Sequence, residues 1–239
     1  MKISLVILGL NEIEGLKYIM PRVDRSLFEQ IILLDGGSTD GSAEWAKEHG
    51  YEVYVQKKVG IRNAHLESLD LIRGDVILTF SPDNNCTPED IPIMIDEMKK
   101  GYDLVVASRY KGGIKSDDDD IITEFGNWFF QTIIRTFHGK NYDYSDPMTI
   151  YRIFKKDIYY KLDLLEEKYY KIPETLFFTN IGWEALMSMR AAKANLKISE
   201  IPSVELARVG GVRKLQIIRW GLSYFYQVLA EIFIWKKKF

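Results

Sequence analysis

The stretch LLDGGSTDGS, residues 33–42, predicts a buried strand that ends at Asp35, a sharp turn and the start of a helix. The glycines at 36 and 37 let the backbone turn at little steric cost, and Ser38 to Asp40 can cap the next helix. We expect the Asp35 carboxylate to be exposed at the strand end, where it can accept hydrogen bonds from a nucleobase or a ribose. The stretch therefore predicts one strand-to-helix unit of an α/β fold, with a binding group at its end.

The same order of strand and then helix repeats through residues 1–110. We expect strands over Ile3–Leu8, Gln30–Asp35, Glu52–Val55, Asp75–Phe80 and Leu104–Ala107. Helical patterns lie between them, near residues 13–22, 40–49, 60–72 and 88–100. This alternation predicts a mostly parallel sheet flanked by helices, with ligands bound outside the carboxyl ends of the strands.

The second half of the chain is less regular. Its patterns predict strands over 150–154 and 197–201 and helices over 121–137, 181–194 and 214–235. The glycines and four aspartates of residues 111–120 predict a loop, and we interpret the aspartates as a solvated lid rather than a metal site. No repeat or Pro-rich linker divides the 239 residues, so we expect a single domain with functional halves 1–110 and 111–239.

The composition excludes several classes of protein. Lys and Arg number 32 against 34 Asp and Glu, a net charge of −2, which disfavours a generally basic nucleic-acid binder. A single cysteine, Cys86, excludes an intrachain disulfide and is interpreted as inert. The three histidines have no metal-ligand spacing, so we interpret them as surface or packing residues.

The end of the chain differs in charge from the rest. From Arg208 onward there are seven basic residues and one acidic residue, so the tail carries +6 and residues 1–207 carry −8. Arg219 and Glu231 interrupt the apolar stretch 215–235. The uninterrupted apolar run between them is therefore shorter than the roughly 20 residues that a membrane-spanning helix needs. We expect an amphipathic helix in the headgroup region of a membrane; a core-packing helix with a solvated tail is the alternative.

Two further motifs place polar residues after strands. In LGLNEIEG, residues 8–15, Asn11 and Glu12 follow the first strand. In LTFSPDNNCTPED, residues 78–90, Asp83 follows a buried strand, with the amides of Asn84 and Asn85 beside it. Carboxylate and amide oxygens there suit a divalent ion that keeps positions open for phosphate oxygens.

In this order, the three motifs resemble those of the family 2 glycosyltransferases with a GT-A fold, most closely the dolichyl- and polyprenyl-phosphate sugar synthases. The resemblance continues through ASRYKGG (107–113), GNWFF (126–130), DPMTIYR (146–152) and EIPSVELARVGGVRK (200–214), and so covers nearly the whole chain. It implies a Rossmann-like, mostly parallel sheet flanked by helices and an inverting transfer of a sugar from a nucleotide-diphosphate donor.

The resemblance also implies residue roles. Asp83 matches the last carboxylate of the family's DXD motif and, with Asn85, would hold Mg²⁺ or Mn²⁺. The donor, linked to GDP or UDP, would be bound by residues at the strand ends: Leu10, Asn11, Glu12, Asp35, Gly37, Arg62, Asp83 and Arg109. The acceptor and phosphate groups would be bound by Asn127, Glu184, Arg208 and Lys214, and the expected catalytic residues are Asp83, Asp146 and Arg208.

The chain departs from the family pattern at two positions. Ser81 stands where the first Asp of DXD is expected, and Asp35–Gly36 stands where the family has two aspartates. Metal binding would then depend on Asp83, Asn85 and the diphosphate itself.

The acceptor implied by the resemblance is a polyprenyl or dolichyl phosphate, which is already anionic and requires no strong base. A hydroxyl acceptor on a lipid-linked saccharide or polysaccharide is the alternative, with Asp146 or Glu184 as the base. A non-catalytic sugar-nucleotide-binding module remains a second alternative, whereas an NAD-dependent dehydrogenase lacks its Gly-rich fingerprint. Because sugar nucleotides are made inside cells, we expect a cytoplasmic protein, peripheral at the inner face of the membrane.

Overall fold

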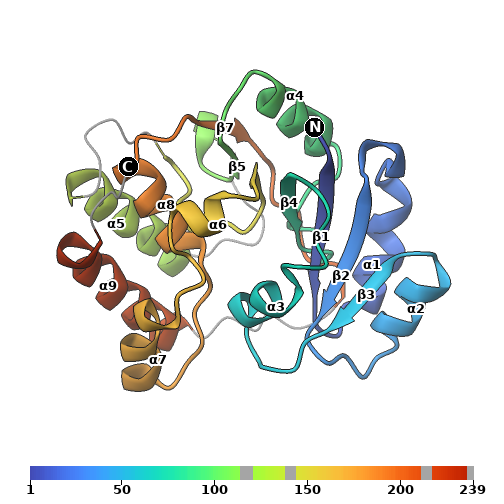
Figure 1. Ribbon diagram of the computed structural model, residues 1–239, viewed down its shortest axis with the longest axis horizontal. Helices are drawn as coiled ribbons and strands as arrows, with labels where there is room; N and C mark the ends of the chain where they lie inside the picture. Colours follow the sequence, from blue (N-terminus) through green and yellow to red (C-terminus); the bar gives the residue numbers. More distant parts are fainter. Residues whose placement is uncertain (114–120, 138–143, 211–216, 236–239) are drawn as a thin grey trace.

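The computed structural model describes residues 1–113, 121–137, 144–210 and 217–235 (Figure 1). Within them the strands form one seven-stranded sheet in the order β3-β2-β1-β4-β6-β5-β7. Every neighbouring pair is parallel except those of β6, which runs antiparallel to β4 and β5. The strands are β1 Ile3–Gly9, β2 Gln30–Asp35, β3 Glu52–Val55, β4 Val76–Phe80, β5 Leu104–Ser108, β6 Arg152–Lys155 and β7 Ile198–Pro202.

Helices cover both faces of the sheet. The α-helices are α1 Ile13–Ile19, α2 Ser42–Glu48, α3 Ile61–Ser68, α4 Asp90–Lys99, α5 Ile121–Phe137, α6 Ile158–Lys161, α7 Lys171–Phe177, α8 Glu184–Lys193 and α9 Ile217–Ile234. Short 3₁₀ turns lie at Met20–Arg22, Arg25–Leu27, Lys111–Gly113 and Glu167–Tyr169.

Alternation along the strands divides the core into two layers. Leu5 and Ile7 of β1 belong to the layer that contains the apolar sides of α1, α2 and α4. Val6 between them belongs to the opposite layer, which contains α3, α5, α6, α8 and α9. Because successive side chains of a strand point to opposite faces, an apolar run such as Ile3–Ile7 supplies both layers at once.

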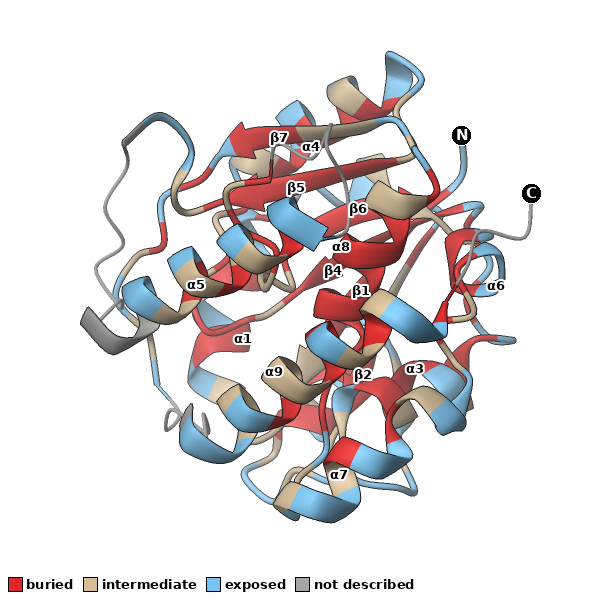
Figure 2. Cartoon of the chain, turned by 90° about the vertical axis from the view of Figure 1, so that its left-hand side faces the viewer, coloured by how far each residue is buried: buried red, intermediate tan, exposed pale blue. Residues whose placement is uncertain are grey.

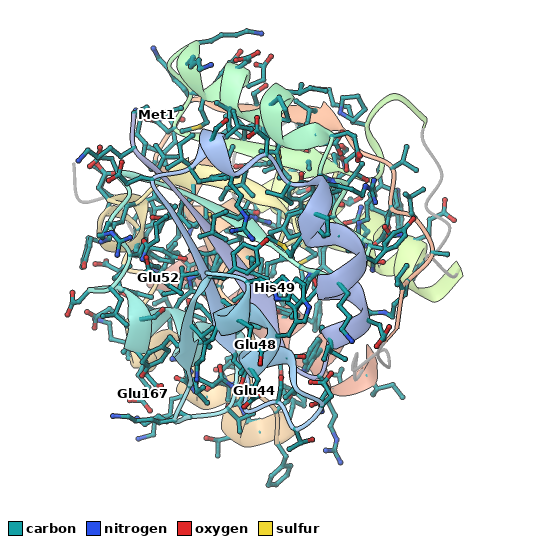
Figure 3. The ribbon with its side chains drawn as sticks, turned by 90° about the vertical axis from the view of Figure 1, so that its right-hand side faces the viewer. Met1, Glu44, Glu48, His49, Glu52 and Glu167 are labelled. Carbon is teal, nitrogen blue, oxygen red and sulfur yellow. The ribbon has the colours of Figure 1, made fainter. Side chains whose placement is uncertain are left out.

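The outer surfaces of the two layers differ. On the side of α2 and β3, Glu44, Glu48 and Glu52 are exposed (Figure 3). On the opposite side, α5, α7 and α9 are exposed along their outer faces, whereas the strands behind them are buried (Figure 2). Among the described residues, no helix is both long and apolar enough to cross a membrane.

The mostly parallel α/β fold expected from the sequence is confirmed, and every expected strand and helix that lies within the described residues is present. The antiparallel direction of β6 and the short helices α6 and α7 were not expected. The aspartates at 117–120 and the expected phosphate-binding Lys214 lie outside the described residues.

Candidate active site at the carboxyl edge of the sheet

The polar residues singled out in the sequence meet at one edge of the sheet. Parallel pairing aligns the carboxyl ends of β1 and β2, where Gly9 lies beside Asp35, and those of β5 and β7, where Ser108 lies beside Pro202. Strand β6 runs the other way, so the residues that precede it, including Asp146, reach the same edge. The reversal of β6 thus brings the second half of the chain to the site.

Asp35 accepts hydrogen bonds from its own turn. Its Oδ2 accepts from the backbone N–H groups of Gly37 and Ser38, both at 2.9 Å, and its Oδ1 accepts from Ser38 Oγ at 2.5 Å. Gly37 has a φ of 91°, which an L side chain rarely adopts, so the turn requires glycine there. The expectation of an exposed carboxylate is wrong, because these bonds hold Asp35 at 1% exposure.

The turn after β1 is tied to the turn after β2. Asn11 has a φ of 54°, donates its N–H to Ser38 Oγ at 2.8 Å and accepts from the Thr39 N–H at 2.8 Å. The Glu12 N–H donates to Ser42 Oγ at 3.0 Å. Leu10 packs so closely against Gly36 that a Cβ at position 36 would lie 3.0 Å from the Leu10 Cβ. The two motifs therefore form one preorganised wall of the site.

Arg208 joins the start and the end of the chain. Its Nη2 lies 2.8 Å from Asp83 Oδ2, and its Nη1 lies 3.5 Å from Glu12 Oε1. The backbone beside it is also fixed, because the Val209 N–H donates to the Asp83 carbonyl at 3.1 Å and Asn84 Nδ2 donates to the Ala207 carbonyl at 2.8 Å. One guanidinium thus neutralises two carboxylates from different strand ends.

This junction requires a glycine on α1. A Cβ at Gly15 would lie 1.8 Å from the Pro82 carbonyl oxygen, closer than any real contact. Gly15 therefore lets α1 lie directly against the turn that carries Asp83.

The residues around Asp83 fit a divalent ion only in part. Asp83 Oδ1 accepts from the Asn85 backbone N–H at 3.1 Å, which ties the carboxylate to the turn that carries the Asn85 side chain. Yet no group of three or more His, Cys, Asp or Glu side chains in the described ranges could hold a metal. This incomplete set of hard oxygen ligands fits an ion that takes its remaining ligands from water and phosphate.

A second charged cluster lies around Asp146. Arg109 donates from Nε to Asp146 Oδ2 at 2.6 Å and from Nη2 to Oδ1 at 3.0 Å, while its Nη1 lies 3.6 Å from Glu205 Oε2. Asp146 is fully buried. Burial alone would lower the pKa of Arg109, but the charges of Asp146 and Glu205 raise it well above its ordinary value. Arg109 is therefore a fixed, permanent cation at the edge.

Glu200 and Asn127 lie behind this cluster. Glu200, on β7, accepts hydrogen bonds from the backbone N–H groups of Ser145 and Asp146 and from Ser145 Oγ. Burial raises the pKa of Glu200, and the hydrogen bonds from Ser145 oppose that shift. Asn127 Nδ2 donates to the Ser145 carbonyl at 2.8 Å, and its buried Oδ1 has no partner among the described residues.

Two expected site residues have partners away from this edge. Arg62 Nη2 lies 2.9 Å from Glu174 Oε2, an ion pair between α3 and α7 that is largely buried. Glu184 begins α8, and burial raises the pKa of its carboxyl group, which lies 3.5 Å from the Tyr224 hydroxyl. The structure thus brings most of the expected residues that it describes to one edge, with Asn127 behind them and only Arg62 and Glu184 away from it. Those at the edge are Asn11, Glu12, Asp35, Asp83, Asn85, Arg109, Asp146 and Arg208.

Sequence reasoning missed Glu205, Ser145 and the role of Glu200. Glu200 and Glu205 both lie in the quoted motif EIPSVELARVGGVRK, so a signal existed. The sequence does not assign roles to these two glutamates, because only the pairing of β7 with β5 shows that Glu205 lies near Arg109 and that Glu200 contacts Ser145.

Comparison with known proteins shows the family of the chain. The family model described as glycosyl transferase family 2 matches residues 4–162, more than half of the chain. The chain belongs to the family 2 glycosyltransferases. The matched region carries both wall motifs, Asp83, Arg109 and Asp146, whereas Glu200, Glu205 and Arg208 lie beyond it.

Relatives of this family 2 member include lipid-phosphate sugar transferases. It is 26% identical to the dolichol-phosphate mannosyltransferase of Pyrococcus furiosus, over 90% of this chain and 60% of the relative. It is 25% identical to the undecaprenyl-phosphate mannosyltransferase of Micrococcus luteus, over 93% and 95%. Glycosyltransferase AglJ of Haloferax volcanii is 27% identical, over 84% and 62%. The chain thus spans about six tenths of the length of two of these relatives.

Solved structures share the fold. Glucosyl-3-phosphoglycerate synthase from Mycobacterium tuberculosis, in complex with Mn²⁺, uridine diphosphate and phosphoglyceric acid, superposes with a TM-score of 0.68 at 19% identity, over 98% of this chain and 80% of that one. The GT-A-like fold implied by the resemblance is therefore confirmed.

Proposed function

We propose that the protein transfers a sugar, with inversion, from a nucleotide-diphosphate donor to a lipid phosphate of the polyprenyl type. The choice of acceptor rests on the burial and the contacts of the two candidate bases, Asp146 and Glu184. Asp146 is fully buried and held by Arg109 through two hydrogen bonds. Glu184 is turned onto its own backbone, where a Cβ at Gly182 would lie 1.9 Å from Glu184 Oε2. Neither carboxylate is placed to deprotonate a hydroxyl, and a phosphate acceptor requires no base.

In this proposal residues 1–110 bind the donor, linked to GDP or UDP. The wall formed by Asn11, Asp35 and Gly37 contacts the nucleoside, and Asp83 and Arg208 lie where the diphosphate must be neutralised as it leaves. Residues 111–239 complete the site for the acceptor, with Asn127 and Lys214 as phosphate or lipid-headgroup contacts, and Arg109 of the first half contacts a phosphate beside them. Asn127 Oδ1 supports this assignment, because it is buried with no donor among the residues that the structure describes, and such an acceptor is costly unless a ligand supplies a donor.

Asp83 and Asn85 would hold Mg²⁺ or Mn²⁺, which acts as a Lewis acid on the leaving diphosphate. The chain's own contribution is Arg208. Its guanidinium now lies on Asp83 and Glu12 and can form charge-assisted hydrogen bonds with phosphate oxygens when the donor binds. The two carboxylates hold it in place until then.

Helix α9 supports a location at a membrane surface. Its polar residues, Ser223, Gln227 and Glu231, are spaced by four and buried against the protein. Its outward residues are mostly apolar, with Ile218 77% and Phe233 81% exposed, and Arg219 is the charged residue exposed beside Ile218. A helix that is polar inward and apolar outward is the reverse of the amphipathic helix of a protein surrounded by water.

The neighbouring helix α5 extends this apolar surface. Phe125 and Trp128 of α5 are 60% and 57% exposed, and Phe129 lies 5.7 Å, between ring centroids, from Phe225 of α9. Not every aromatic residue at this end of the chain joins the surface: Tyr224 and Trp235 point inward, because the Tyr224 hydroxyl accepts from the Gly182 N–H and Trp235 Nε1 donates to Asp163. We propose peripheral association through α5 and α9 with the cytoplasmic leaflet, which the basic tail favours.

The test is a donor panel of GDP- and UDP-linked hexoses and N-acetylhexosamines, with Mg²⁺ or Mn²⁺, with and without polyprenyl phosphate. A shift in melting temperature measures donor binding, and the release of nucleotide measures transfer of the sugar. The proposal expects one donor to release nucleotide only when the lipid phosphate is present. Release with a hydroxyl acceptor instead, or binding without any release, contradicts it; the latter outcome identifies a non-catalytic binding module.

The variant Asp83→Asn tests the site itself. It preserves the size of the side chain but removes the charge that faces Arg208 and the ion, so we expect nucleotide release to fall by about 100-fold to 1,000-fold. Asp24→Asn is the control, since Asp24 only caps the exposed 3₁₀ turn Arg25–Leu27. Wild-type rates in Asp83→Asn would remove Asp83 from the site.

A further inference from the structure

The largely buried carboxylate of Glu200 accepts hydrogen bonds from two backbone N–H groups and a hydroxyl group of the loop before β6. Its Oε1 accepts from the Ser145 N–H at 2.9 Å and the Asp146 N–H at 3.2 Å, and its Oε2 accepts from Ser145 Oγ at 2.7 Å. Two consecutive backbone N–H groups and a hydroxyl thus surround one carboxylate, as in an anion nest. Glu200 is 8% exposed, so these bonds replace water as its solvation.

The peptide that Glu200 holds is the one that carries Asp146. Ser145 is fixed from other sides as well, by Ser108 Oγ at 2.6 Å and by Asn127 Nδ2 on its carbonyl at 2.8 Å. Asp146 in turn fixes the Arg109 guanidinium through Nε and Nη2. A continuous series of short hydrogen bonds therefore runs from Glu200 on β7 to the cation at the edge of the site.

The arrangement costs free energy, which argues against a purely structural role. Glu200 and Asp146 are two carboxylates close together in a buried region, and the charge of Asp146 raises the pKa of Glu200. A neutral side chain could tie β7 to this loop without like-charge repulsion. A carboxylate presents acceptors on both oxygens, so it holds both N–H groups and the hydroxyl without bringing a donor toward the Ser145 N–H, which lies 2.9 and 3.0 Å from its two oxygens.

We propose that Glu200 is a positioning residue that fixes the Ser145–Asp146 peptide, so that Asp146 holds Arg109 toward a substrate phosphate. The inference rests on the proposed function, in which Arg109 binds a phosphate of the donor or of the lipid acceptor. Glu200 thus serves the Arg109 cluster, while Arg208 is held by Asp83 and Glu12.

A double-mutant cycle tests this coupling. Glu200→Gln preserves the shape but brings an NH₂ donor against backbone N–H groups. We expect Glu200→Gln to raise one KM by about tenfold, which corresponds to about 1.4 kcal/mol, and to change kcat less than threefold. The affected KM should be that of the substrate whose KM Arg109→Ala also raises. In the Arg109→Ala background the same change should add less than twofold, because the residue through which it acts is gone.

The control is Ser199→Ala, next to Glu200 on β7, whose hydroxyl faces away toward Glu97 at 3.3 Å. It should leave both KM values unchanged. If Glu200→Gln fails to fold, Ser145→Ala keeps the backbone contacts to Glu200 and removes the hydroxyl contacts to Glu200 and Ser108. It should raise the same KM by a smaller factor, and that effect should also depend on Arg109.

The outcomes separate this inference from the proposed function. A tenfold effect that persists in the Arg109→Ala background, or no effect of Glu200→Gln, rejects the positioning role while wild-type transfer stands. Absence of transfer by the wild type rejects the proposed function. In that case the cycle is measured on the Kd of UDP and GDP with Mg²⁺. An effect of Glu200→Gln on Kd that disappears in the Arg109→Ala background supports the positioning role, and one that persists there, or no effect, rejects it.

Discussion

The helical layers on the two faces of the sheet are built in opposite ways. The layer of α1, α2 and α4 packs apolar residues such as Leu16, Ala46 and Met94 against the strands and exposes charged residues such as Glu44. The layer of α3, α5, α8 and α9 buries charged groups, including Arg190, and exposes large apolar side chains, including Phe233. The first layer is suited to water on its outside, whereas the second is suited to an apolar environment.

The contrast between the two helical layers indicates which face of the fold is adapted to a special environment. The conventional layer positions the turns that we propose to bind the donor, and its charged outer surface is ordinary for a surface that faces water. The inverted layer carries costly features, buried ion pairs and exposed aromatics, that a domain surrounded by water gains nothing from. The predictions below test whether the two layers differ as the structure indicates.

The largest expected effect is on a buried ion pair in the inverted layer. Arg190 is paired with Glu231 of α9 at 2.8 and 3.1 Å, and the two side chains are 0% and 2% exposed. Glu231→Gln leaves the buried guanidinium without a counter-charge, so we expect the free energy of unfolding to fall by about 3–5 kcal/mol. Denaturant unfolding monitored by circular dichroism measures it.

The matched change in the conventional layer is Glu89→Gln. Glu89 also binds an arginine, Arg22, in a bidentate manner at 2.8 Å, but the two side chains are 60% and 32% exposed. We expect a loss of at most about 1 kcal/mol. Equal losses at the two positions would show that burial does not distinguish the layers.

The next effect concerns His65 on α3, which is fully buried among Tyr159 and Trp183. Burial lowers the pKa of His65 to about 3. The unfolded chain therefore binds a proton below about pH 6.5 that the folded protein does not, so stability present above that pH is lost as the pH falls. Between pH 6.5 and 5 the loss from this group is about 2 kcal/mol.

His65→Phe should flatten the decline of the unfolding free energy over this range, whatever its effect on absolute stability. His49→Phe is the control, because His49 is exposed on α2 and stacks on Trp45. Parallel pH profiles for wild type and His65→Phe would show that His65 does not remain neutral in the fold.

The smallest effect concerns the outer surfaces. Phe233→Ser on α9 should weaken binding to anionic lipid vesicles by about tenfold, since part of the ~1.5–3 kcal/mol of a buried Phe side chain is lost. Stability should change by no more than about 0.5 kcal/mol, because the side chain is 81% exposed. Vesicle co-sedimentation and thermal unfolding measure the two quantities.

Ile93→Ser on α4 is the control in the conventional layer, where Ile93 is 51% exposed. It should leave vesicle binding unchanged. An equal loss for both variants would mean that vesicle binding follows general hydrophobicity and not the inverted layer.

Much of the fold could be predicted from the sequence because its signals are local. The strand ending at Asp35, the turn that requires a positive φ at Gly37 and the helix that follows depend on residues within ten positions of one another. The exposure of Asp35 was wrongly expected, since the hydrogen bonds from Gly37 and Ser38 that bury it depend on backbone directions. The antiparallel β6 was missed because its four residues carry no sign of strand direction.

Local patterns in the sequence were enough to predict the alternation of strands and helices, the polar residues at the strand ends and the family to which the motifs belong. Which charged groups meet depends on how the strands are ordered in the folded sheet. Arg208 reaches Asp83 and Glu12, Arg109 reaches Asp146, and Glu200 holds Ser145, each across tens to hundreds of positions in the chain. The physical reason is that strand pattern and turn chemistry act over a few residues, whereas ion pairs and buried hydrogen bonds depend on strand order and direction, which the whole sheet sets.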